Sequence, residues 1–126
     1  MKSIINTKKA PEPIGPYNQA VLTGNMLFTS GQIAINVETG ELVLDSIEAE
    51  TKQVMDNLKA VLEAADMTFE NIIKTSIFIS DMNNFGKINA IYATYFNALT
   101  APARETVEVA NLPKFVNVEI SAIAAK

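Results

Sequence analysis

The segment Ile72-Ile-Lys-Thr-Ser-Ile-Phe-Ile-Ser80 decides the fold class of this chain of 126 residues. Its side chains follow a period of two, which places every second residue on the same face of a β-strand. One face should carry Ile73, Thr75, Ile77 and Ile79, and the other should carry Ile72, Lys74, Ser76, Phe78 and Ser80. We therefore expect a strand that is buried mainly on one side.

Segments with helical spacing flank this strand. The first helix should begin at a capping box formed by Asp45 and Glu48. Its buried stripe is expected to consist of Ile47, Thr51, Val54, Leu58, Val61, Leu62 and Ala65. The second helix should begin near Asn83 or Asn84 and should be stopped by Pro102. Its buried side is expected to consist of Phe85, Ile88, Tyr92, Tyr95, Phe96 and Leu99.

Pairs of strands are expected at both ends of the chain. Residues 18–22 and 26–36 are rich in β-formers and meet at Thr23-Gly24-Asn25, which predicts an antiparallel hairpin. Two further strands should cover about 105–110 and 116–124. The order ββαβαββ predicts an α+β fold, with two helices packed on one face of a mostly antiparallel sheet and the other face uncovered. No change in composition marks a linker, so one domain spanning residues 1–126 is expected.

The composition narrows the range of partners. Hydrophobic residues make up 48% of the chain and charged residues only 19%, which leaves little polar surface and favours self-association. A net charge of −4 disfavours binding to phosphate backbones, so nucleic acid is not an expected partner. The sequence has no apolar leader and no stretch as long as a membrane span. A cytoplasmic protein without membrane contact is therefore expected.

The chain contains neither cysteine nor histidine. Disulfides and thiolate nucleophiles are excluded, and the commonest general base and transition-metal ligand are missing. Residues 81–86 begin like a calcium loop, but Phe85 offers no ligand oxygen and Tyr92 stands at the closing glutamate position. No phosphate loop or dinucleotide fingerprint is present. We therefore expect no metal site and no cofactor, and any chemistry must use carboxylates, hydroxyls, amides, arginine and water.

Arg104 is the only arginine in the chain, beside nine lysines. Lysine supplies charge at a surface, whereas two parallel hydrogen bonds to a carboxylate or phosphate need the planar fork of arginine. From composition alone, a functional role for Arg104 is no better supported than the accidental survival of one arginine in a lysine-rich chain.

Glu119 is the second candidate. In the last strand, alternation should place Val118, Ile120, Ala122 and Ala124 under the helices and turn Glu119 to the opposite face. A glutamate on that face is either solvated or faces a partner subunit, and the high apolar content favours the partner.

Three separated motifs carry a resemblance to a known family. They are Ile14-Gly-Pro-Tyr17 with Gln19-Ala20, then Thr29-Ser-Gly-Gln32, and a C-terminal block of Pro102-Ala-Arg104, Thr106-Val-Glu-Val109, Leu112-Pro113, Val118-Glu-Ile120 and Ala122-Ile-Ala124. In this order and at these distances they resemble the RidA family, also called the YjgF family. The resemblance covers the whole chain and is more specific than any single short motif.

This resemblance implies a fold, an assembly and an activity. RidA-like proteins have a chorismate-mutase-like fold and form homotrimers, whose sheets build a central barrel with a pocket at each subunit boundary. The implied activity is the hydrolytic deamination of reactive enamine and imine intermediates, such as 2-iminopropanoate and 2-iminobutanoate, to 2-oxo acids and ammonia. The expected ligand is thus a small imino or 2-oxo acid.

The resemblance also assigns roles to residues. Arg104 would hold the substrate carboxylate, Glu119 would hold and deprotonate water, and the backbone carbonyl of Thr106 would orient that water. The remaining residues implied to bind substrate are Tyr17, Ser30, Gly31 and Asn89. Each has an ordinary alternative: Tyr17 as a packed aromatic, Ser30-Gly31 as a turn that ends a strand, and Asn89 as a helix amide that points to water.

Two positions depart from the family pattern. Glu105 stands where a small serine or threonine is expected and could compete for the guanidinium of Arg104, although strand alternation should turn it away. Ser121 replaces a glutamate that is frequent in relatives, which leaves fewer acidic groups on that face. Both departures bear on substrate choice more than on activity.

Two other functions compete with the deaminase. A regulatory module could bind small 2-oxo acids without turnover and would use the same arginine. An endoribonuclease activity has been attached to some relatives, but the acidic charge and the missing histidine weigh against it.

Overall fold

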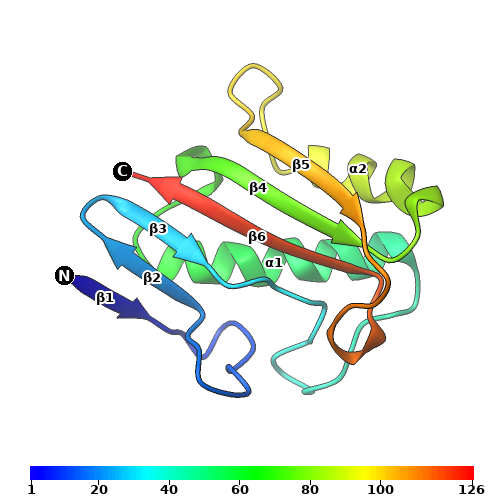
Figure 1. Ribbon diagram of the computed structural model, residues 1–126, viewed down its shortest axis with the longest axis horizontal. Helices are drawn as coiled ribbons and strands as arrows, with labels where there is room; N and C mark the ends of the chain where they lie inside the picture. The colour runs from blue at the N-terminus through cyan, green and yellow to red at the C-terminus, as the bar shows by residue number, and fades with distance from the viewer.

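The computed structural model describes all 126 residues as one six-stranded sheet with both helices on the same face (Figure 1). The strands are β1 (Lys2–Ile5), β2 (Ala20–Thr23), β3 (Met26–Thr29), β4 (Ile72–Ile79), β5 (Ala103–Glu108) and β6 (Val118–Ala125). Across the sheet they are ordered β1-β2-β3-β6-β4-β5, with β4 and β5 parallel and the other neighbours antiparallel. The α+β class, the mostly antiparallel sheet and the helices on one face are confirmed.

The predicted order ββαβαββ is wrong at the N-terminus, because it omits β1. This strand extends the hairpin by pairing along β2, from Lys2 opposite Thr23 to Ile5 opposite Ala20. Its four residues, most of them exposed, are too few for a period of two to stand out. The predicted second strand of the hairpin is also too long, since β3 ends at Thr29.

Helix α1 (Ile47–Ala64) begins one position later than the capping box predicts. Its N-cap is Ser46, whose hydroxyl accepts a hydrogen bond from the backbone N–H of Ala49 at 3.0 Å. Asp45 and Glu48 therefore do not form the cap. The predicted stripe is confirmed: Thr51, Val54, Leu58, Val61, Leu62 and Ala65 are buried, and Ile47 packs against them while partly exposed.

Strand β4 follows the predicted alternation except at its beginning. Thr75, Ile77 and Ile79 are buried under the helices, but Ile73 is 48% exposed and Ile72 only 4%. The register of β4 against β6 shifts between Ile72 and Lys74. This irregularity turns Ile72 inward in place of Ile73, as a β-bulge does.

Helix α2 (Phe85–Ala93) is shorter than predicted. A 3-10 turn (Met82–Asn84) capped by the side chain of Asp81 precedes it. The backbone N–H groups of residues 94, 95 and 96 bond to the carbonyls three residues earlier, which tightens the last turn into the end of the helix. Asn97 then accepts from the N–H of Leu99, which begins a turn well before Pro102. Leu99 is 93% exposed, so its predicted burial is wrong.

The face of the sheet opposite the helices is uncovered (Figure 1). An apolar row crosses it, because direct pairing places Ile4 beside Val21, Val21 beside Phe28 and Phe28 beside Ile123. Ile4 is 46% and Phe28 43% exposed. Neither helix is both long and apolar enough to cross a membrane.

Candidate functional site

Arg104 lies on the edge strand β5, and its side chain extends over the helix side of the sheet. Its Nη1 donates a hydrogen bond of 2.6 Å to Oδ1 of Asn89 on α2. The guanidinium carbon lies 5.5 Å from the ring centroid of Phe85 and 5.1 Å from that of Tyr92. Cation–π contacts with two rings and one hydrogen bond fix the orientation of the guanidinium. The structure therefore brings together two of the residues predicted for the site, Arg104 and Asn89.

A cavity of about 260 Å³ opens beside this pair, and we call it the Arg104 cavity. Its lining consists of Asn89, Tyr92, Ala93, Phe96, Ala98, Ala101 and Arg104. The guanidinium has five N–H donors, and the structure shows one protein acceptor for them, the amide oxygen of Asn89. The remaining donors can bind both oxygens of a carboxylate, while the apolar wall suits a short alkyl group.

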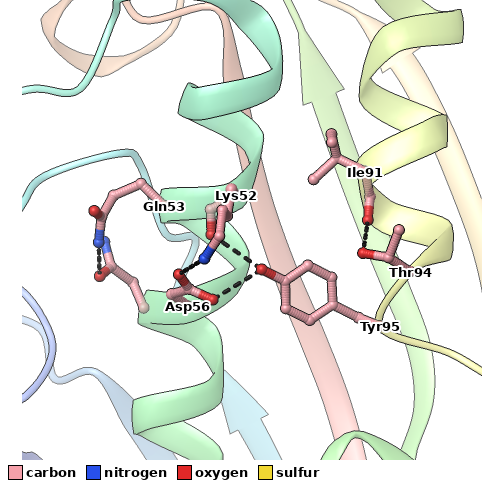
Figure 2. A network of polar contacts seen from close by, with 7 residues as sticks. Lys52, Gln53, Asp56, Ile91, Thr94 and Tyr95 are labelled. Carbon is pink, nitrogen blue, oxygen red and sulfur yellow. Dashed lines mark hydrogen bonds and ion pairs between the residues drawn. The ribbon is translucent and has the colours of Figure 1, made fainter.

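Helix α2, which carries Asn89, is anchored to α1 by a polar network (Figure 2). The hydroxyl of Tyr95 donates a hydrogen bond of 2.8 Å to Asp56 on α1, and Lys52 bonds the other oxygen of Asp56 at 2.8 Å. Burial, followed by the neighbouring carboxylate of Asp56, raises the pKa of Tyr95 far above its ordinary value, so the hydroxyl remains a donor. The network holds the turn directly after α2, at Tyr95, against α1.

Glu119 lies on β6 and points to the uncovered side of the sheet, as alternation predicts. It is half-buried in a second cavity of about 320 Å³, which we call the Glu119 cavity. The cavity is lined by Pro11, Glu12, Ile14, Tyr17, Gln19, Gly31, Gln32, Ile33, Ile35, Pro113, Lys114 and Glu119. Burial raises the pKa of the Glu119 carboxyl above its ordinary value, which makes the carboxylate a stronger base than a solvated one.

Two further predicted residues, Tyr17 and Gly31, line the Glu119 cavity. Tyr17 is 50% exposed, and its hydroxyl accepts a hydrogen bond of 3.3 Å from the backbone N–H of Ile14. Gly31 touches the side chain of Glu119 directly, since a Cβ on Gly31 would lie 2.7 Å from the Glu119 carboxyl carbon. Ser30 precedes it, and its hydroxyl donates to the carbonyl of Asn18 at 2.6 Å. That donor is therefore already engaged within the protein.

Residues that the sequence interpretation missed hold Glu119 from both sides. The buried carboxylate of Glu50 on α1 accepts from the backbone N–H groups of Asn117 and Val118, at 2.8 and 3.1 Å. After Glu119, two backbone hydrogen bonds of 2.8 and 3.1 Å join Ile120 to Gln32. The only signal for Glu50 was a glutamate in the buried stripe of a helix, at the position before Thr51.

Lys114 also lines the Glu119 cavity and was not predicted. It lies in a 3-10 turn (Pro113–Phe115), in which Lys114 and the next residue, Phe115, have φ angles of 54° and 55°. Two adjacent non-glycine residues in the left-handed region are held there at a conformational cost. The sequence gives no local signal for this conformation, because neither residue is glycine or asparagine.

Thr106 and Glu105 occupy opposite faces of β5. The hydroxyl of Thr106 is buried on the helix side, where no protein group bonds to it. Glu105 faces the other way, bonds to Ser76 at 2.8 Å and pairs with Lys74 at 3.2 Å. The hydroxyl of Ser76, followed by Lys74, lowers the pKa of Glu105. Glu105 therefore does not compete for the guanidinium of Arg104, as alternation predicts.

The predicted residues thus form two groups rather than one site. Arg104, Asn89 and Thr106 lie on the helix side, whereas Glu119, Gly31 and Tyr17 line a cavity on the uncovered side. Strand register explains the separation: Arg104 pairs with buried Thr75, while Glu119 pairs with Phe78 on the opposite face of β4. Within one subunit, the cationic group and the acidic group therefore lie in separate cavities on opposite faces of the sheet.

Comparisons with known proteins identify relatives over the whole length. Residues 7–126 match the family model described as endoribonuclease L-PSP. A RutC family protein of Pyrococcus horikoshii is 51% identical over 126 residues, which cover 100% of this chain and 99% of that protein. The 2-iminobutanoate/2-iminopropanoate deaminase of Escherichia coli K12 is 48% identical over 128 residues, covering 100% and 99%.

Solved structures of relatives also match the fold of this chain. The crystal structure of the YjgF gene product of Escherichia coli has a TM-score of 0.92 at 47% identity, covering 98% of each chain. The structure of Escherichia coli TdcF with bound serine has a TM-score of 0.92 at 43% identity and the same coverage.

Proposed function

The chain belongs to the RidA family, to which the endoribonuclease L-PSP and RutC descriptions also refer, and we propose that it hydrolyses reactive enamine and imine intermediates. The proposed substrates are 2-iminopropanoate and 2-iminobutanoate, and the products are 2-oxo acids and ammonia. A relative 48% identical over its full length carries the name of this activity. The two cavities offer the chemistry that such a substrate needs.

In the proposed reaction, Arg104 holds the carboxylate through two parallel N–H donors. Its orientation is set in advance by Asn89 and the two aromatic rings, so little freedom is lost when substrate binds. The apolar side of the Arg104 cavity accommodates the methyl or ethyl group of the substrate.

Glu119 acts on water in this proposal. Its carboxylate accepts a proton as the water oxygen attacks the imine carbon, and the backbone carbonyl of Thr106 orients the water. Glu119 passes this proton to the imine nitrogen, which gives a carbinolamine. It then takes the proton of the new hydroxyl group and delivers it to the amino nitrogen, so that the carbon–nitrogen bond breaks, the 2-oxo group forms and ammonia leaves. The raised pKa of Glu119 supports this exchange, because a base works best when its pKa approaches the working pH. No metal or cofactor enters this scheme.

The separation of Arg104 from Glu119 is the observation that carries the proposal. If both act on one substrate, they must come from different subunits, so the site requires an oligomer. The apolar row on the uncovered face supplies a surface that a neighbouring subunit would bury. We propose a homotrimer whose sheets form a central barrel, with three sites at the subunit boundaries.

The activity is tested by ammonia release from imines generated in the assay by an amino-acid oxidase or a threonine dehydratase. The protein should accelerate ammonia release above the rate in buffer. The same rate with and without protein would refute the proposed deaminase.

The shared site is tested by mixing two inactive variants, Arg104→Ala and Glu119→Gln. Each variant alone should lack turnover. After denaturation and joint refolding at equal amounts, about one boundary in four should combine an intact arginine with an intact glutamate. About a quarter of the activity of the unmodified protein should return. If mixing restores nothing while the two variants form mixed trimers, the two residues do not share a site.

A binding function without turnover is the second candidate. Its support is the structure of TdcF, a relative with bound serine, which is a ligand that carries one carboxylate. Under this alternative, Arg104 would still bind a 2-oxo acid, and Glu119→Gln would change neither affinity nor any rate of imine hydrolysis.

A further inference from the structure

Gly31 is the one glycine at which an added Cβ would clash with a neighbouring side chain. Its φ lies outside the left-handed region, unlike that of Gly15, Gly24 and Gly40. The backbone conformation therefore does not require glycine at this position. What requires it is space, since a Cβ here would lie 2.7 Å from Cδ, 2.8 Å from Cγ and 3.0 Å from Oε2 of Glu119.

The surrounding backbone leaves no other way to relieve this contact. Gln32, the residue after Gly31, is joined by two hydrogen bonds to Ile120, the residue after Glu119. On the other side, Glu50 holds the N–H groups of residues 117 and 118. The two backbone segments, around Gly31 and around Glu119, are thus fixed at the point of contact, and only the side chain of Glu119 can move.

We propose that Gly31 is a positioning residue, which forms a seat for the Glu119 carboxylate and sets where that base stands in the cavity. This inference rests on the proposed role of Glu119 as the base. It differs from the role that the family resemblance implies for Gly31, which is contact with substrate. In the seated position the carboxylate lies over a surface without side-chain atoms, where it is half-buried.

The size of the effect follows from the distances. Ordinary contact between carbon atoms begins near 3.4 Å, so a Cβ at 2.7 Å would displace the Glu119 carboxyl carbon by about 0.7 Å or more. A misplacement of about 1 Å at a catalytic group costs on the order of 10² in rate. Gly31→Ala should therefore lower kcat by roughly 10-fold to 100-fold and change KM little, because Arg104 is untouched.

Displacement should also change the titration of Glu119. The other ionisable groups that line its cavity are Glu12, Tyr17 and Lys114. Within one subunit, desolvation is what raises the pKa of Glu119. In the proposed trimer, Arg104 of the neighbouring subunit would face the same site and lower this pKa, in the unmodified protein and in the glycine variants alike. A carboxylate pushed off Gly31 toward solvent should therefore titrate at lower pH, and the acidic limb of the kcat/KM profile should move to lower pH with it.

Gly86 offers a matched control. It has no atom within 4 Å of the site of an added Cβ, and its φ is not left-handed. Gly86→Ala should leave kcat, KM and the titration of Glu119 unchanged. Carbon-13 NMR of the labelled glutamate carboxyl groups, assigned through Glu119→Gln, measures the titration in each variant without any substrate.

A double variant keeps the test decisive if Gly31→Ala folds poorly. In the background of Glu119→Ala, the clash has no partner, so Gly31→Ala should lower the melting temperature much less than it does in the unmodified chain. Equal losses in both backgrounds would overturn the seat. An unchanged titration of Glu119 together with an unchanged kcat would also overturn it. A rise in KM and weaker pyruvate inhibition as the only effects would overturn it too, because these two changes indicate that Gly31 contacts the substrate.

The two proposals can fail separately. If the unmodified protein releases no ammonia from imines, the deaminase fails, while the titration and the double variant still decide the role of Gly31. If the unmodified protein is active and Gly31→Ala has none of these effects, only the seat is refuted.

Discussion

Replacing Arg104 with lysine tests whether the site needs the planar guanidinium group or only a positive charge. Each charge-assisted hydrogen bond is worth about 1.5 to 3 kcal/mol, so a bidentate pair contributes roughly 3 to 6 kcal/mol. Lysine restores one bond at best and lacks the flat surface that rests against Phe85 and Tyr92. We expect kcat/KM to fall at least about 10²-fold in Arg104→Lys and about 10³-fold to 10⁴-fold in Arg104→Ala.

The assay is ammonia release from imines made by an amino-acid oxidase, with pyruvate as a competitive inhibitor in parallel. Inhibition should weaken together with kcat/KM, because both depend on the same carboxylate. Lys87→Ala is the matched control, since it removes one exposed positive charge from α2 and should change neither value. Full activity in Arg104→Lys would refute the reasoning from the fork. Arg104→Ala should also lose about 1 to 2 kcal/mol of stability with its two ring contacts.

Three further predictions concern Glu119, the anchor of α2 and the assembly. Glu119→Gln should lose most turnover, by about 10²-fold or more, yet raise the melting temperature at neutral pH. The sign follows from the raised pKa of Glu119: the folded state holds the proton more tightly than the unfolded state, so this carboxyl lowers the stability of the fold as pH rises above 4.5. Glutamine does not ionise and removes this loss. An unchanged or lower melting temperature of Glu119→Gln at pH 7 would contradict the prediction. Tyr95→Phe should lower the free energy of unfolding by about 0.5 to 1.5 kcal/mol in urea denaturation, because Asp56 loses one hydrogen bond; a loss below the error of the measurement would mean that the anchor is not needed. Light scattering at micromolar concentration should give about three times the chain mass of 13.7 kDa, and a monomer mass would rule out the shared site.

The elements that sequence could predict are those in which one periodic pattern runs for many residues. The stripe of α1 and the alternation of β6 were predicted correctly because burial alone decides them. The end of α2 was not, because Ala93 is followed by apolar residues that continue the helical spacing while short backbone bonds and the Asn97 side chain redirect the chain. The bulge in β4 was missed for a related reason, since a shifted register leaves no trace in composition.

The candidate site likewise contains contacts that could be predicted from the sequence and contacts that could not. Pairs on one element or on adjacent elements, such as Arg104 and Asn89, are brought together as expected. The contact of Gly31 with Glu119 could not be predicted, because it joins residues 88 positions apart and depends on how closely two backbones approach. Glu50 was overlooked because a glutamate in a buried helical stripe is ordinarily a surface residue at the edge of the stripe.

If Arg104 and Glu119 act on one substrate, as proposed, their placement on opposite faces of the sheet would make catalysis depend on protein concentration. A subunit that dissociates from the proposed trimer would keep both side chains but would no longer hold a complete site. Specific activity should then decline on dilution to the range where the trimer dissociates, and recover on concentration without refolding. The abundance of the chain would thus set both how many sites exist and what fraction of them can work.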